Sequence, residues 1–230
     1  MDREHASRPR LALHGQRAPM GFDDATREFY DGSVWLVGDA GRPHMLVAVE
    51  RYPDKWSYEL TLIAPPPISL TNSQGWAWKP RLPPFEDRTI MGAVPAERSV
   101  ARKQEMSKLA ERFTAVEFYG EEGRRQLRLM ARPIWQYQDE KNGILDGALF
   151  VYANGTNPEI LLVLEARADK NGKRAWHYGL GRLGGAKMDV ELDGKLVWEV
   201  QTGQGPYSQG PYAWYSIPFT AIPREAATSK

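Results

Sequence analysis

The chain has 230 residues, and its 30 basic and 29 acidic side chains give a formal net charge of +1 at pH 7. These charges are mixed along the sequence without a basic stripe, so we expect no nucleic-acid partner. The absence of cysteine excludes disulfides, thiolate metal sites and cysteine nucleophiles. The four histidines (His5, His14, His44 and His177) lack the spacing of a helical zinc motif. We therefore expect neither a metal nor a cofactor.

The start of the chain shows no targeting signal. Residues 1–19 are polar, which predicts a chain that is either cytoplasmic or exported with its signal peptide already removed. Residues 1–18 lack a hydrophobic period and are expected to form a disordered or loosely docked lead-in. The longest apolar runs, such as 160–164, are too short to span a membrane, so the chain is expected to be soluble. The pattern does not indicate an oligomeric state.

The first half, residues 19–79, has the pattern of a β meander. Apolar alternation and turn residues predict strands near 34–38, 45–51 and 56–63, and a hairpin of 68–71 with 76–78. A connector of residues 80–112 follows and carries the one expected helix, at about 97–112. Pro95 suits the helix entry and Ser99 is a candidate cap. The apolar stripe of this helix consists of Met106, Leu109, Ala110 and Phe113.

The second half, residues 113–200, repeats the strand pattern. Asn154-Gly155 and Asp193-Gly194 predict tight turns, the latter of type I′ in a two-residue hairpin. Strands are expected near 113–119, 126–137, 148–152, 160–166, 176–180, 188–192 and 196–198. The last segment, residues 201–230, is rich in glycine, proline and aromatic residues.

The two halves also resemble each other in sequence. Residues 31–37 match 146–152, and 41–50 match 156–165 at the same offset; after a short insertion, 56–60 match 176–180. Trp78 then matches Trp198. Such recurrence predicts one supersecondary unit used twice and packed against itself. The predicted fold is mainly β, with two pseudo-equivalent antiparallel meanders joined by one α-helix. Their sheets are expected to pack as a sandwich or as curved half-barrels in one compact unit.

Three ionisable residues are catalytic candidates. Glu50 and Glu165 close equivalent strands, and a pair of carboxylates is how some glycoside hydrolases assemble their acid and base. A structural role is favoured, because duplicated halves keep what the fold needs twice. His177 points away from the aromatic face of its strand, but no serine or aspartate in a triad motif accompanies it.

The ligand-binding candidates are aromatic. Exposed rings on a glycine-proline frame are suited to stacking on sugars or peptides. The alternative is that the C-terminal segment forms an edge strand or lid and buries its rings. The candidates are Trp76, Trp78, Tyr207, Tyr212 and Trp214.

The order of these segments resembles a family of uncharacterised proteins from planctomycete-type bacteria. The similar segments are 34–38, 41–43, 106–115, 127–134, 146–151, 155–162 and 176–178. The resemblance implies that the duplicated layout is shared by such proteins. It implies no activity, and no catalytic residue is carried over from it.

The residues favour a non-enzymatic binding or interaction protein whose ligand is a carbohydrate or a peptide or protein surface. No nucleophile, phosphate-loop or cofactor motif is present, whereas aromatic residues near turns are abundant. Two alternatives stay open. The first is a carbohydrate-active hydrolase or lyase that uses carboxylates. The second is a carrier that holds an apolar ligand between curved sheets.

Overall fold

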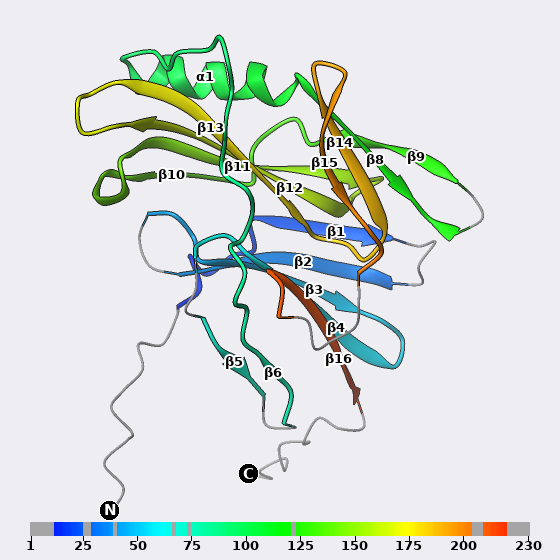
Figure 1. The fold of residues 1–230 in the computed structure, drawn as a ribbon. Coiled ribbons are helices and arrows are strands. Elements are labelled where there is room, and N and C mark those ends of the chain that lie inside the picture. The colour runs from blue at the N-terminus through cyan, green and yellow to red at the C-terminus, as the bar shows by residue number, and fades with distance from the viewer. Residues whose placement is uncertain are drawn as a thin grey trace, which may run out of the picture.

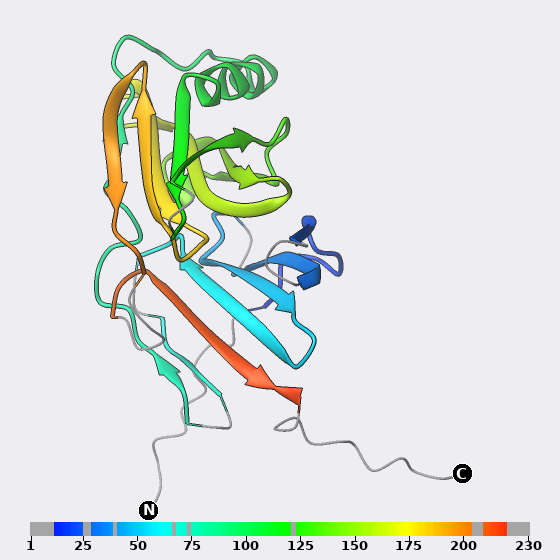
Figure 2. The ribbon, with the colours of Figure 1, turned by 90° about the vertical axis from the view of Figure 1, so that its right-hand side faces the viewer.

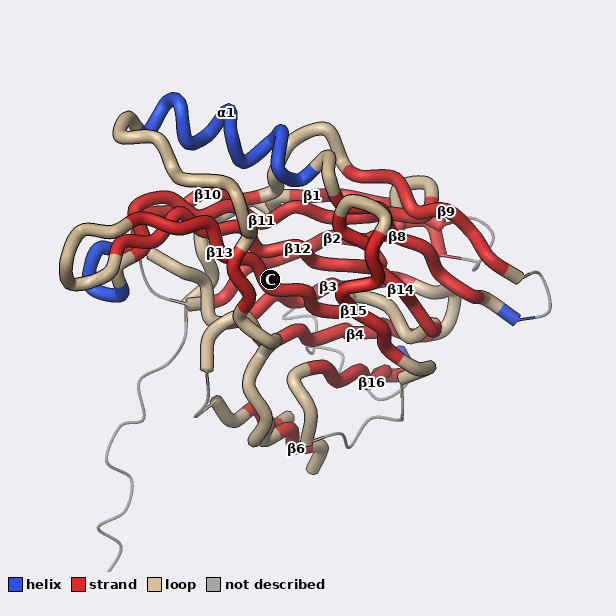
Figure 3. The backbone as a smooth tube through the Cα atoms, turned by 45° about the horizontal axis from the view of Figure 1, so that its top comes forward, coloured by secondary structure: helices blue, strands red, loops and turns tan. Residues whose placement is uncertain are grey.

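The computed structural model describes residues 12–24, 29–38, 41–65, 68–72, 75–120, 123–203 and 209–219. Within these ranges the protein is mainly β, with two antiparallel sheets stacked as a sandwich (Figure 1). The helix α1 (Ser99–Ala110) lies on the far side of the larger sheet (Figure 3). The predicted fold class is confirmed.

The smaller sheet has five strands in the order β1-β2-β3-β4-β16. Its bounds are β1 (Met20–Asp24), β2 (Phe29–Val37), β3 (Met45–Arg51), β4 (Lys55–Leu62) and β16 (Tyr212–Pro218). The first four strands follow the chain as a meander, whereas β16 returns from the C-terminal segment to pair with β4. A separate hairpin packs on the outer face of this sheet and consists of β5 (Leu70–Thr71) and β6 (Ala77–Trp78).

The larger sheet has nine strands and curls into a half-barrel (Figure 2). Eight of them run in the order β15-β14-β8-β9-β11-β12-β13-β7, and β10 pairs with β11. The bounds are β7 (Arg88–Thr89), β8 (Phe113–Phe118), β9 (Arg124–Leu129), β10 (Trp135–Asp139), β11 (Ile144–Asn154), β12 (Asn157–Ala168), β13 (Arg174–Arg182), β14 (Lys187–Leu192) and β15 (Lys195–Val200). The short 3-10 helix η3 (Glu140–Asn142) connects β10 to β11.

The two four-stranded meanders, β1 to β4 and β10 to β13, have the same strand registers. Gly32 pairs with Glu50 between β2 and β3, and Gly147 pairs with Glu165 between β11 and β12. These are the pairings that the sequence alignment of the two halves predicts. Positions in one meander therefore have defined counterparts in the other.

An aromatic ring covers each of these glycines for the same steric reason. Phe22 on β1 lies opposite Gly32, and Tyr137 on β10 lies opposite Gly147. A β-carbon would approach the Phe22 ring to 2.6 Å at Gly32 and the Tyr137 ring to 2.4 Å at Gly147. Only glycine leaves room for the rings, and both strand pairs then shift register at the next residue.

Three hydrophobic clusters hold the layers together. One fills the half-barrel under α1 and includes Met106 and Trp176. A second lies between the two sheets and joins Leu36 and Leu46 to residues such as Leu149 and Val163. The third lies between the five-stranded sheet and the β5–β6 hairpin.

The local predictions succeed where short-range signals are strong. The helix begins at Ser99 and ends at Ala110, and its predicted stripe is buried. Ser99 is not the cap, however, because the N-cap is Arg98 and the Ser99 hydroxyl donates to Asp146 Oδ1 at 2.9 Å. Asp193 and Gly194 have φ angles of 52° and 75°, as a type I′ hairpin turn requires.

The ends of the chain are described only in part. Residues 1–11 lie outside the described ranges, and within the rest of the predicted lead-in Leu13 forms a β-bridge with Val37. In the C-terminal segment, residues 204–208 and 220–230 lie outside the description, so the prediction for Tyr207 falls on an undescribed residue.

Candidate functional site

The inner face of the five-stranded sheet changes character from one side to the other. On β1 to β3 this face is mainly apolar and packs against the nine-stranded sheet, with Glu50 of β3 as a buried polar exception. On β4 and β16 it carries polar and aromatic side chains, because Ser57 pairs with Ser216, and Glu59 pairs with Trp214. Directly opposed residues of an antiparallel pair share one face. The strands thus place a polar surface inside the sandwich.

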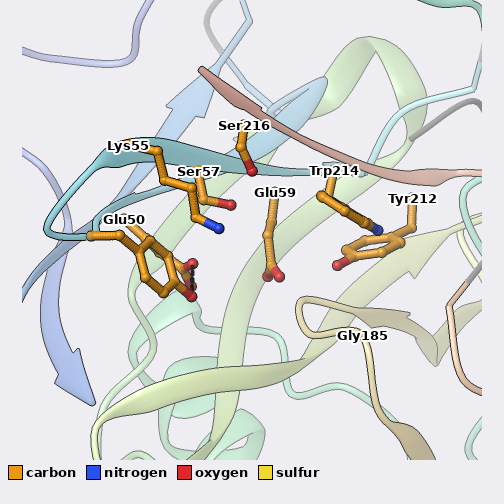
Figure 4. A pocket seen from close by; sticks show the side chains of 9 residues that line it. Glu50, Lys55, Ser57, Glu59, Gly185, Tyr212, Trp214 and Ser216 are labelled. Carbon is orange, nitrogen blue, oxygen red and sulfur yellow. Dashed lines mark hydrogen bonds between the residues drawn. The ribbon is translucent and has the colours of Figure 1, made fainter. Parts of the chain in front are cut away.

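A cleft of about 330 Å³ opens over this polar surface. We call it the inter-sheet cleft; it is lined by Glu50, Tyr52, Lys55, Ser57, Glu59, Gly185, Tyr212, Trp214 and Ser216. Figure 4 shows the side chains of β4 and β16 pointing toward the loop that carries Gly185. The volume of the inter-sheet cleft is near the lower end of the range of about 300–1,000 Å³ that is usual for small-molecule sites.

Two carboxylates lie on this surface. Glu59 pairs with Ala48 of β3, which places Glu50, two residues further along β3, diagonally next to Glu59 on the same face. Glu50 is 5% exposed, and its Oε2 accepts a 3.2 Å hydrogen bond from the Tyr52 hydroxyl. The ammonium of Lys55 lies 4.9 Å from the Tyr52 ring centroid. The cleft thus holds two carboxylates and one ammonium group next to aromatic rings.

Arg182 packs against the ring of Tyr212, which lines the inter-sheet cleft. Its guanidinium lies 4.9 Å from the Tyr212 ring centroid and donates 2.8 Å hydrogen bonds to the carbonyls of Gly184, Ala186 and Gln201. Burial lowers the pKa of Arg182. Burial also raises the pKa of Tyr212, and the nearby carboxylate of Glu59 raises it further. Tyr212 is therefore a neutral hydroxyl group at the cleft wall.

Glu165 has a different environment from its counterpart Glu50. Glu165 is 1% exposed. Its Oε1 accepts a 2.5 Å hydrogen bond from the Tyr137 hydroxyl and also forms an ion pair with Arg42 Nε at 3.1 Å. Its Oε2 accepts from Arg167 Nε at 2.7 Å and pairs with Nη2 at 2.5 Å. Burial raises the pKa of Tyr137 well above its usual value, and the charge of Glu165 adds to this rise. Glu165 is a buried, arginine-paired structural carboxylate.

His177 pairs with Glu165 in the register of β12 and β13. Its Nδ1 lies 3.3 Å from the Asp87 carboxylate, which also accepts a 2.8 Å hydrogen bond from Arg167. Burial by itself lowers the pKa of Arg167, but the charges and hydrogen bonds of Glu165 and Asp87 raise it overall. The structure thus links Glu165 to the neighbourhood of His177 through Arg167 and Asp87 and places Glu50 in the inter-sheet cleft.

The aromatic candidates lie on opposite faces of the five-stranded sheet. Tyr212 and Trp214 line the inter-sheet cleft on the inner face. Trp76 stacks on Tyr215 on the outer face, with ring centroids 4.2 Å apart. Trp78 is buried there and its Nε1 donates to the Gly210 carbonyl. The structure therefore separates these candidates into two pairs.

Sequence reasoning missed Ser57, Glu59 and Ser216. The local signal for the first two is the alternation of β4, where Trp56, Tyr58 and Leu60 occupy one face and the polar residues the other. That Ser216 and Trp214 join them depends on the pairing of β16 with β4, a contact between distant parts of the chain.

Among the described residues, no group of three or more histidine, aspartate or glutamate side chains is arranged to hold a metal ion. None of the helices in the described ranges is both long and apolar enough to cross a membrane. Comparisons of the chain with protein-family models, with curated proteins and with solved structures found no match. The resemblance to a planctomycete-type family therefore stays a prediction.

Proposed function

We propose that this chain is a non-enzymatic binding protein that takes a small polar ligand into the inter-sheet cleft. The observation that carries the proposal is the pairing of Glu59 with Trp214 on the face that lines the inter-sheet cleft. A carboxylate beside a flat indole provides both a hydrogen-bond acceptor and a stacking surface. Ser57 and Ser216 add hydroxyl groups that donate and accept.

The counterpart surface in the nine-stranded sheet supports this proposal. Gly179 occupies the position equivalent to Glu59, since it pairs with Val163 as Glu59 pairs with Ala48. The ring of Phe85 covers it, so that a β-carbon on Gly179 would approach the ring to 2.0 Å. One inner face is therefore filled by the chain itself, whereas the other is left for a ligand.

Ligand titrations of two tryptophan variants test the proposal. A panel of mono- and disaccharides and short peptides is titrated by calorimetry into wild type, Trp214→Ala and Trp76→Ala, the last of which alters the opposite face of the same sheet. We expect Trp214→Ala to weaken binding about tenfold or more, because truncating an aromatic anchor of a binding site costs about 2 kcal/mol or more. Trp76→Ala should bind as wild type. Loss of binding in Trp76→Ala alone would place the site on the outer face.

A carboxylate-dependent hydrolase is the second candidate, with Glu50 and Glu59 as its acid and base. The backbone positions of diagonal neighbours on a sheet lie about 7–8 Å apart, so the two side chains can reach the carboxyl separation of about 6.5–9.5 Å that inverting glycosidases use. A glycoside panel tests it. Turnover that disappears in both Glu50→Gln and Glu59→Gln would favour catalysis over simple binding.

A further inference from the structure

The chain holds one of its own guanidinium groups on the inner face of the nine-stranded sheet. At the Glu165 position of the nine-stranded sheet, the guanidinium of Arg42 pairs with the carboxylate at 3.1 Å. The same guanidinium lies 5.2 Å from the centroid of the Phe85 ring, which covers Gly179. Arg42 belongs to the loop between β2 and β3, whereas Glu165 and Gly179 belong to β12 and β13. The space beside Glu165 and Phe85 is therefore filled by a side chain from a different part of the chain.

The inter-sheet cleft also combines carboxylates with an aromatic ring, although only Glu50 has a carboxylate as its counterpart. Glu50 stands where Glu165 stands in the other meander, with the same register to its neighbours. Glu59 adds a second carboxylate at the position of Gly179. Trp214 provides an aromatic surface in the cleft, as Phe85 does beside Arg42.

The charge of the cleft favours a cation. Its lining has two carboxylates, Glu50 and Glu59, against the one ammonium of Lys55. The other cation nearby, Arg182, donates to three backbone carbonyls and interacts electrostatically with Glu59 and with the buried Glu159. With these two groups included, three carboxylates exceed two cations. A planar guanidinium forms two parallel hydrogen bonds to a carboxylate and also stacks on indole, which an ammonium group cannot do equally well.

We propose that the inter-sheet cleft binds an arginine side chain presented by a peptide segment. This inference rests on the proposed function and names the ligand class of that same site. The guanidinium lies between the Glu59 carboxylate and the Trp214 ring, and Glu50 completes the acidic wall. Arg42 is the internal precedent for this chemistry, because its guanidinium pairs with the carboxylate of Glu165 and lies beside the ring of Phe85.

The probe is a short acetylated and amidated peptide with one arginine, compared with the same peptide in which citrulline replaces arginine. Citrulline keeps the shape but is neutral. Binding is measured by calorimetry with wild type, Glu50→Gln, Glu59→Gln and the exposed control Glu111→Gln. We expect the citrulline peptide to bind about tenfold more weakly or worse, because it loses the charge-assisted hydrogen bonds of the guanidinium to the carboxylates. Each cleft variant should lose affinity similarly, Glu111→Gln should not, and added salt should weaken binding.

The two proposals fail in distinguishable ways. Equal affinity for the arginine and citrulline peptides would overturn the guanidinium inference, and this comparison does not depend on how well any variant folds. Saccharide binding that is lost in Trp214→Ala, without arginine binding, would overturn the inference and leave the proposed function standing. If neither peptides nor saccharides bind in the cleft, both proposals are wrong.

Discussion

The Thr61 hydroxyl on β4 donates a 2.7 Å hydrogen bond to the carbonyl of Arg182 on β13, which joins the two sheets directly. A β-carbon on the neighbouring Gly181 would meet the Thr61 methyl group at 3.3 Å, so the sheets approach each other closely here. Thr61 and Gly181 are also equivalent positions, since they pair with Leu46 and Leu161. The two meanders therefore contact each other here through their last strands, β4 and β13.

Thr61→Val should destabilise the protein by about 1–2 kcal/mol. Valine has nearly the same shape, but it leaves the Arg182 carbonyl without this donor at a buried position, where Thr61 is 2% exposed. Urea unfolding followed by circular dichroism measures the change. Thr71→Val, at an exposed site on β5, is the matched control and should stay within about 0.5 kcal/mol of wild type. Equal midpoints for the two variants would show that the inter-sheet hydrogen bond contributes nothing.

Glu165→Gln should be among the most destabilising conservative changes, at about 3 kcal/mol or more. Glutamine keeps the shape, but it leaves the Arg42 guanidinium, which is 15% exposed, without this counter-charge, and it leaves Arg167, which is 23% exposed, with Asp87 alone. Unfolding midpoints in urea give the loss, with the exposed Glu111→Gln as the control. A loss below about 1 kcal/mol would indicate that Asp87 alone suffices to neutralise Arg167.

Much of the fold follows from local patterns and from the similarity of the two halves. The residues that the sequence aligns, such as Glu50 with Glu165 and Trp56 with Trp176, occupy corresponding places in the strand registers. A meander pairs neighbouring strands, so short-range periodicity is enough to specify it. The correspondence extends to two hairpins. Leu70 pairs with Trp78 in one, as Val190 pairs with Trp198 in the other, although the two hairpins belong to different sheets.

The site could be predicted only in part, because its contacts are long-range. Glu50, Tyr212 and Trp214 are candidates from the sequence, but nothing local shows that β16 pairs with β4. The same limit applies to β7 of the connector, which adds to the edge of β13. Pairings between distant segments depend on how the whole sandwich closes, and neither propensity nor periodicity contains that information.

Gly179→Ala should cost about 1–3 kcal/mol, because the new methyl group would enter the Phe85 ring. Gly185→Ala is the control, since a β-carbon there meets no atom within 4 Å. A double-mutant cycle with Phe85→Ala identifies the cause: the cost of Gly179→Ala should fall once the ring is removed. If the cost is the same in both backgrounds, the strain comes from the strand backbone and not from Phe85.

Buried tyrosines should make the protein sensitive to alkali. Burial raises the pKa values of Tyr137, Tyr152 and Tyr212 above the ordinary value near 10. Each hydroxyl stays protonated in the folded state while it ionises in the unfolded chain, so the unfolded state binds fewer protons above that pH. The stability that these groups contribute is therefore complete below about pH 10 and is lost as the pH rises through the folded-state pKa values.

Tyrosinate absorbance and circular dichroism, recorded together against pH, test this prediction. These tyrosines should ionise only as the sheets unfold. Tyr137→Phe should reduce the absorbance change of that cooperative step. Ionisation of all ten tyrosines with the circular dichroism unchanged would contradict this prediction.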